Sequence, residues 1–118
     1  MKFLCLVILD GDIAAAMKPE DWNVIDEDSM AYDRELVRRG CFIAAQALHG
    51  PETARTIRVR RGETIATDGP FMETKEQVAG FILVDVPDME AALEVARGIP
   101  LARIGAVEVR PVMEFEQR

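Results

Sequence analysis

Two almost uninterrupted apolar runs constrain the fold of this chain more than any other feature. They are FLCLVIL, residues 3–9, and VAGFILVDV, residues 78–86. A strand with one face in water alternates apolar and polar side chains, whereas a continuous apolar run is typical of a central strand covered on both faces. The first run is also far too short to span a bilayer. We therefore predict two buried strands within one sheet.

The segment between the two runs begins with a helix signal. Residues 19–39 repeat apolar positions at three- and four-residue spacing, and Pro19 and Gly40 suit the first turn and the stop of a helix. The predicted inner face of this helix holds Trp22, Ile25, Ser29, Tyr32 and Leu36. The segment DGDIAAAMKPED that leads into it is expected to be a loop.

The rest of the chain predicts shorter elements. A second helix is expected over residues 88–98, with Asp88 as its N-cap. Further strands are expected over residues 41–48 and 106–115, and a hairpin that turns at Gly62 over residues 54–67.

The predicted order is strand, helix, strand, hairpin, strand, helix, strand. Two helices on one face of an antiparallel sheet, with an inserted hairpin, indicate a ferredoxin-like α+β fold, and we expect residues 1–118 to form one domain. Because two helices cover one face only, the apolar strands need another cover on the second face. We therefore predict a homodimer that packs sheet against sheet.

The composition excludes several classes of function. A net charge of −7 argues against nucleic-acid binding, which needs an excess of Lys and Arg. One histidine and two separated cysteines, Cys5 and Cys41, do not supply a tetrahedral metal site, and we expect no metal or other cofactor. Both cysteines adjoin apolar residues, as buried thiols of a reducing compartment do. Asp10 and Asp12 interrupt the only run that resembles a signal peptide, so we predict a cytoplasmic protein with no membrane partner.

A strong turn signal, Asp68-Gly69-Pro70-Phe71, precedes the second apolar run. Two roles are open for Asp68. Its carboxylate could close the turn by accepting a hydrogen bond from the backbone amide of Phe71 or a neighbour, or it could act as a general base at a pocket mouth. We rank the structural role first, because turn chemistry alone would select the same residues.

The residues around this turn resemble a known family. The turn together with Glu73, Lys75, Glu76, Gly80 and Phe81 is similar to the DGPF branch of the YCII-related proteins. The opening MKFLCLVILDGD, the hairpin TIRVRRGETIATDGPF and the end IPLARIGAVEVRPVMEF resemble the same family, so the similarity covers nearly the whole chain.

This resemblance implies a dimeric α/β barrel related to muconolactone-isomerase-like proteins. Some members of the branch resemble modules linked to extracytoplasmic-function sigma factors. Enzymatic relatives in the wider superfamily use a His–Asp pair with the histidine early in the chain. Residues 1–48 contain no histidine here, so this sequence departs from that pattern.

Several side chains near the turn are candidates for a site. Lys75 could hold an anionic group of a small molecule and Glu73 could share proton transfer with Asp68, although a short mixed-charge run is usually solvated. Arg58 could orient the same anion, or it could simply blunt an edge strand, and Phe71 is a further candidate for substrate contact. His49 is the one side chain with an ordinary pKa near neutrality, although it could equally be a loop residue.

Two functions follow from different classes. The first is a cofactor-independent enzyme of the lyase, isomerase or dehalogenating type, with Asp68 as proton acceptor and His49 or Glu73 as the second proton group. The second is a non-catalytic dimeric ligand-binding or regulatory module, in which the turn only shapes the fold.

Overall fold

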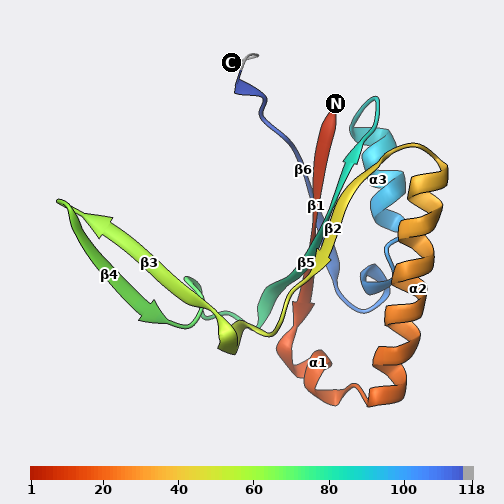
Figure 1. Ribbon diagram of the computed structural model, residues 1–118. Coiled ribbons are helices and arrows are strands. Elements are labelled where there is room, and N and C mark those ends of the chain that lie inside the picture. Colours follow the sequence, from red (N-terminus) through yellow and green to blue (C-terminus); the bar gives the residue numbers. More distant parts are fainter. Residues whose placement is uncertain (116–118) are drawn as a thin grey trace.

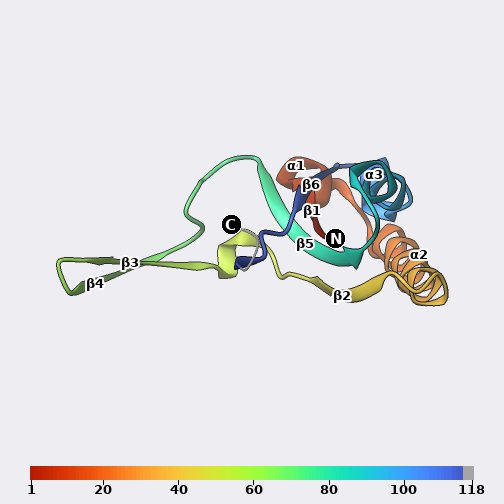
Figure 2. The ribbon, with the colours of Figure 1, turned by 90° about the horizontal axis from the view of Figure 1, so that it is seen from above.

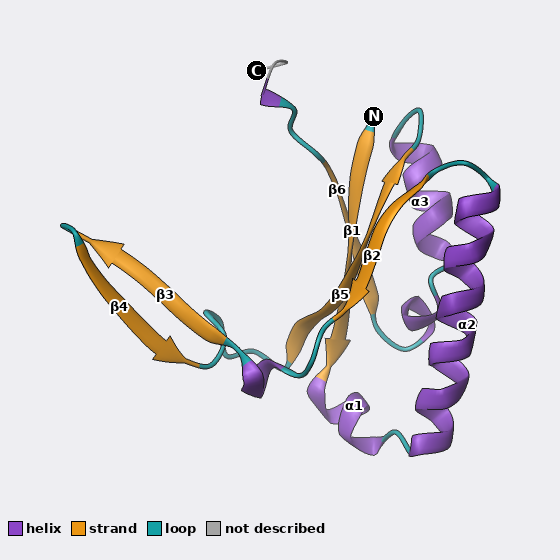
Figure 3. Ribbon diagram, in the orientation of Figure 1, coloured by secondary structure: helices purple, strands orange, loops and turns teal. Residues whose placement is uncertain are grey.

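A four-stranded antiparallel sheet, a separate hairpin and helices on one face make up the protein (Figures 1 and 3). The computed structural model describes residues 1–115. The helices are α1 (Gly11–Ala16), α2 (Pro19–Arg38) and α3 (Met89–Arg97), with 3-10 turns η1 (Pro51–Thr53) and η2 (Pro100–Arg103). The strands are β1 (Lys2–Asp10), β2 (Phe42–Ala47), β3 (Arg55–Arg60), β4 (Glu63–Asp68), β5 (Glu76–Asp85) and β6 (Ala106–Pro111).

The main sheet has the strand order β2-β5-β1-β6, and all its pairs are antiparallel. The two apolar runs form its central strands, as predicted, and Cys5 of β1 lies opposite Ile82 on one side and Val109 on the other. The ferredoxin-like α+β fold with an inserted hairpin is therefore confirmed. The last strand ends at Pro111, short of the predicted residue 115. Its pairing with β1 reaches the start of that strand there, where the Val112 amide donates a 2.9 Å hydrogen bond to the Lys2 carbonyl.

Helices α2 and α3 cover the same face of this sheet (Figure 2). The core beneath them is formed by alternate strand residues and the inner helix positions, among them Phe3, Cys5, Leu36, Val84 and Ala92. The Tyr32 hydroxyl donates a 2.6 Å hydrogen bond to the Val95 carbonyl, which ties the two helices together. Asp88 caps α3 as predicted, because its carboxylate accepts a hydrogen bond from the Ala91 amide.

The segment between β1 and α2 was expected to be a loop, and this expectation is wrong. Residues Gly11–Ala16 form helix α1, whose N-terminus is capped by the Asp10 carboxylate through a 2.7 Å hydrogen bond from the Asp12 amide. This segment ends in three alanines, and alanine has the highest helix propensity of any residue type. Helix α1 bridges the end of β1 and the start of α2 (Figure 1).

The face of the sheet opposite the helices is apolar and uncovered within the described residues. Its centre is formed by side chains of β1 and β5 that are only half-buried, namely Leu4, Leu6, Ile8, Phe81 and Leu83. We call this set the open face. The opposite, helix-covered positions of the same strands are buried, so the prediction that helices cover only one side holds.

The predicted hairpin is present as β3–β4, which we call the arm. It turns at Arg61 and Gly62, and both have positive φ angles, of 52° and 78°, as a two-residue hairpin turn requires. The arm makes its own two-stranded sheet and projects from the body on the side away from the helices (Figures 1 and 2).

Candidate ligand-binding site

A cavity of about 900 Å³ lies between α2 and the half of the sheet nearest α1. Its floor is made by helix-side residues of three strands, Val7 and Leu9 of β1, Ala45 and Ala47 of β2, and Gly80 and Ile82 of β5. The upper half of the same interface is filled by the core. The hollow is therefore a local opening between one helix and one sheet.

The small side chains of the floor explain why the hollow exists. Ala45, Ala47 and Gly80 lie side by side across β2 and β5, and they leave volume that larger residues would fill. Gly80 is also required by the approach of the neighbouring strand, since a Cβ there would lie 2.7 Å from the Gln46 carbonyl oxygen. Helix α1 closes the end of the gap between the sheet and the start of α2 (Figure 1).

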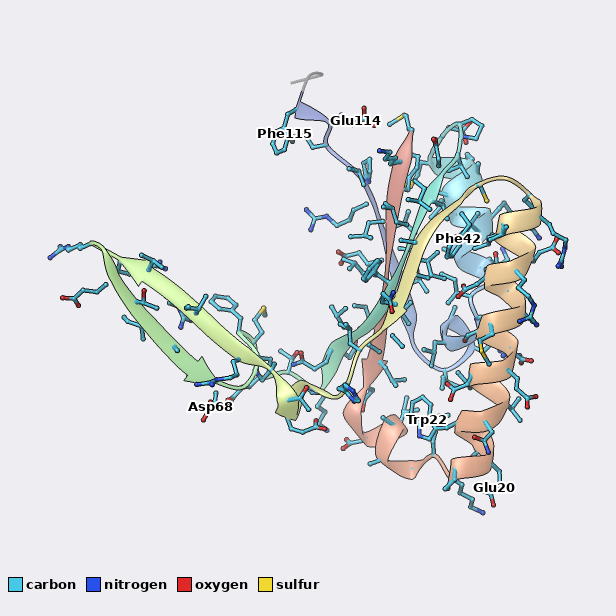
Figure 4. All side chains as sticks on the ribbon, viewed as in Figure 1. Glu20, Trp22, Phe42, Asp68, Glu114 and Phe115 are labelled. Atoms are coloured by element: carbon cyan, nitrogen blue, oxygen red, sulfur yellow. The ribbon has the colours of Figure 1, made fainter. Side chains whose placement is uncertain are left out.

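One face of α2 forms the wall opposite the floor. Its lining residues recur at three- and four-residue spacing, so they share one helix face: Trp22, Ile25, Asp26, Ser29, Met30 and Asp33. Trp22 lies above α1, between α2 and the sheet (Figure 4). The wall thus combines apolar surface with two carboxylates.

The carboxylate of Asp33 is partly buried in the wall of the cavity. Burial raises the pKa of the Asp33 carboxyl above its usual range, and no hydrogen bond or ion pair within the described residues offsets this cost. Asp12, on α1, also lines the cavity, and its carboxylate lies 3.2 Å from Nζ of Lys75. The cation at the cavity is therefore already paired, while Asp33 is not.

The mouth of the cavity is formed by the two segments that join the arm to the sheet. His49, Gly50 and Pro51 come from the first segment, and Thr74 and Lys75 from the second. Backbone hydrogen bonds of 2.8 Å hold both segments, from the Leu48 amide to Ala79 and from the Gly11 amide to Lys75. Of the six residues singled out from the sequence, the structure brings His49 and Lys75 to this site.

The other four candidates lie on the arm or on the loop behind it. The Asp68 side chain is 91% exposed, and its carboxylate lies 3.2 Å from Nε of Arg55, on the adjacent strand. It does not accept the turn hydrogen bond that we expected, since the ion pair across the arm takes its place. Figure 4 shows Asp68 at the base of the arm, well separated from Trp22 in the cavity.

Phe71 and Arg58 contact each other rather than the cavity. The Arg58 guanidinium lies 4.9 Å from the centre of the Phe71 ring, a cation–π geometry on the surface of the arm. Glu73 is exposed in the same loop. Gly69 gives the turn its shape with a φ of 95°, and its amide donates a 2.7 Å hydrogen bond to the Ala54 carbonyl at the base of the arm.

Comparisons with known sequences identify the family of this chain. The sequence model of the YCII-related domain matches residues 1–116. The chain belongs to the YCII-related family. An uncharacterized protein of Rhizobium meliloti (strain 1021) is 36% identical to this chain over 118 residues. The alignment covers 98% of this chain and 95% of the Rhizobium protein. The resemblance read from the turn and its flanking strands is therefore confirmed.

Sequence reasoning missed most of the cavity of this YCII-related protein. It assigned Trp22 and Ser29 to core packing and did not single out Asp12, Asp26 or Asp33. One signal was available, because the predicted inner face of α2 is interrupted by polar residues at Ser29 and, one position beyond Tyr32, at Asp33. Polar residues within an otherwise apolar stripe indicate that the helix does not pack against the sheet at every position of that face.

The described part of this YCII-related protein has no other obvious chemical centre. Within residues 1–115, no three His, Cys, Asp or Glu side chains converge to hold a metal ion, and no helix is both long and apolar enough to cross a membrane. Burial raises the pKa of the Cys5 thiol to about 11, so Cys5 is a packing residue rather than a nucleophile.

Proposed function

We propose that this protein binds a small, mostly apolar molecule that carries a basic nitrogen, in the cavity between α2 and the sheet. The observation that carries the proposal is the cavity itself, whose volume of about 900 Å³ suits a small organic ligand. Its floor is aliphatic and its wall includes an indole, so burial of apolar ligand surface supplies the affinity.

The charges around the cavity favour a cation over an anion. Asp12, Asp26 and Asp33 line it, against the single cation Lys75, which is engaged by Asp12. A protonated amine near Asp33 would give that half-buried carboxylate the partner it lacks among the described residues. The small anionic ligand predicted from Lys75 and Arg58 remains the alternative, and it would have to displace Asp12 from Lys75.

Trp22 makes the proposal directly testable, because it is the single tryptophan of the chain and lines the cavity. Decylamine, decanoate and decanol have similar chains and differ in charge. Titrated below their micelle concentrations, they are expected to change the Trp22 emission in the order amine, then alcohol, then carboxylate. Ala45→Phe fills the floor of the cavity and is expected to abolish the response to all three.

Two results would count against this assignment. Tighter binding of decanoate than of decylamine would favour the anionic ligand and restore the role predicted for Lys75. An unchanged response in Ala45→Phe would place the ligand outside the cavity and remove the basis of the proposal.

Asp33→Asn should test both the cost of the half-buried carboxylate to stability and its contribution to amine binding. Because burial raises the pKa of Asp33 from 3.8, its ionised form costs stability at neutral pH, and the variant is expected to have a higher Tm at pH 7. The gain should vanish as the pH falls below 3.8, where the carboxyl is protonated in the folded and unfolded states alike. The same variant is expected to bind decylamine about tenfold more weakly, while decanol binding stays unchanged.

The matched control for Asp33→Asn is Asp28→Asn, five residues earlier on the same helix. Asp28 lies outside the cavity and pairs with Arg103 at 2.9 Å. This control should leave decylamine binding unchanged. Equal loss of amine binding in both variants would mean that general surface charge, rather than Asp33, attracts the amine.

A second candidate function is cofactor-independent acid–base catalysis in the same cavity. It is favoured by one observation, that an imidazole, His49, and a carboxyl of raised pKa, Asp33, both line the space where a ligand would lie. This pair differs from the predicted set centred on Asp68. It would be supported if a ligand that binds exchanges a carbon-bound hydrogen in D₂O with the wild-type protein and not with His49→Ala.

The proposal includes assembly as a homodimer through the open face. Leu4, Leu6 and Ile8 of β1 and Phe81 and Leu83 of β5 form a contiguous apolar centre on this face, flanked on β6 by the charged residues Glu108 and Arg110. An apolar centre with a charged border is the usual anatomy of a protein interface. A two-fold axis would pair this face with itself and bury it.

A further inference from the structure

The arm exposes several large apolar side chains to solvent. Ile57 and Val59 of β3 are 66% and 58% exposed, and Ile65 of β4 is 50% exposed. A two-stranded hairpin with both faces in water is at best marginally stable. Within residues 1–115, the arm pairs with no strand of the main sheet. Its surface therefore calls for a partner outside the chain.

The direction of the arm limits what that partner is. In both views the arm extends from the sheet away from α2 and α3, on the side of the open face (Figures 1 and 2). A body that docks on the open face would consequently come to lie beside the arm. The two uncovered apolar surfaces of the chain are thus oriented to meet the same partner.

The charge of the arm suits a second copy of this chain as that partner. Residues 55–68 hold four arginines against Glu63 and Asp68, a net charge of +2. The total charge of the chain is −7, so the remaining residues carry −9. A basic arm on an acidic body is complementary to the body of another identical chain, and such complementarity favours encounter and orientation.

We propose that the arm clasps a second copy of this chain, with the face formed by Ile57, Val59 and Ala66 against the partner's body. This inference rests on the homodimer proposed above and adds to it a second contact, outside the open face. Each arm would embrace the other copy, so that a symmetric pair makes the contact twice.

The register of the arm decides which of its faces docks. Ile57 lies opposite Ala66 and Val59 opposite Thr64, so these four residues share one face with little charge at its centre. On the other face, Ile65 lies opposite Arg58, whose guanidinium covers Phe71, and Arg60 lies opposite Glu63. Docking that second face would require desolvation of two arginines, which is costlier than burial of Ile57 and Val59.

The test uses two substitutions of the same kind on opposite faces of the arm. Ile57→Asp and Ile65→Asp each place one carboxylate on an exposed strand position, so the total charge changes alike. By sedimentation equilibrium, Ile57→Asp is expected to raise the dimer Kd at least about tenfold, and Ile65→Asp less than about threefold.

The outcomes separate the clasp from the homodimer. A wild-type chain that is monomeric at micromolar concentration overturns both. A wild-type dimer whose Kd is unaffected by Ile57→Asp, or affected equally by both substitutions, overturns the clasp alone. None of these results bears on ligand binding, which the Trp22 titration measures separately.

Hydrogen exchange of the wild-type protein gives a check that needs no variant. Backbone amides of residues 55–68 are expected to become more protected as the concentration rises through the dimer Kd. Protection gained only in β1 and β5, with the arm unchanged, is the result that excludes the clasp.

Discussion

Leu36→Ala is expected to lower the free energy of unfolding by about 2–5 kcal/mol, the usual cost of truncating a fully buried leucine. Leu36 is 0% exposed and lies where α2 packs on Phe3, Cys5 and Val84 beneath it. This contact lies in the filled half of the interface between α2 and the sheet. Its loss would enlarge the cavity toward the core and weaken the packing of α2 on the sheet.

The neighbouring position supplies the control. Val37 is 59% exposed on the outer side of the same helix, so Val37→Ala removes little buried surface and improves helix propensity. Urea unfolding at one fixed protein concentration should show a large loss for Leu36→Ala and almost none for Val37→Ala. The fixed concentration matters because dimer formation would stabilise the folded state by mass action. Similar losses in both variants would mean that α2 does not anchor the core.

Leu6→Glu is expected to abolish the homodimer at concentrations where the wild-type chain is associated. Leu6 lies near the centre of the open face, opposite Phe81 on one side and Glu108 on the other. A glutamate there would be buried without a partner, beside a like charge, and it would occur twice across a two-fold axis. The dimer Kd should rise at least about a hundredfold, which corresponds to about 2.7 kcal/mol.

Val37→Glu is the matched control for this substitution, since it adds the same charge on the far side of α2. Sedimentation equilibrium should give a monomer for Leu6→Glu and an unchanged dimer for Val37→Glu. Far-UV circular dichroism should show that both remain folded, because the Leu6 side chain is not part of the helix-covered core. Persistence of the Leu6→Glu dimer would mean that the two copies meet through another surface.

The sequence predicted the sheet well because its signals are local. Residues 3–9 are all apolar, residues 78–86 are apolar apart from Asp85, and the Arg61-Gly62 turn needs only a few residues to form a hairpin. Helix α2 was equally readable from Pro19 and Gly40. Helix α1 was misread because its alanines have no periodic apolar pattern and are held mainly by the Asp10 cap.

The cavity could not be predicted from local signals, because it depends on how side chains from several elements pack together. Trp22 and Ser29 both lie on the inner stripe of α2, and nothing local distinguishes Trp22 from the packed Leu36. Only the three-dimensional pairing of Ala45 and Ala47 with Gly80 places small residues opposite them. The turn at Asp68 attracted attention for its chemistry, yet its glycine amide and its carboxylate both hold the base of the arm.

The floor of small residues has a consequence for how such proteins diversify. Ala47 faces the hollow and is not among the residues packed against the core, so an added methyl or isopropyl group there would shorten the space available to a ligand and leave the core packing in place. One or two substitutions in β2 could therefore change which molecule fits, while the strand pairing and the helices stay as they are. At this edge of the sheet, the length of the bound molecule can therefore change with little effect on the stability of the fold.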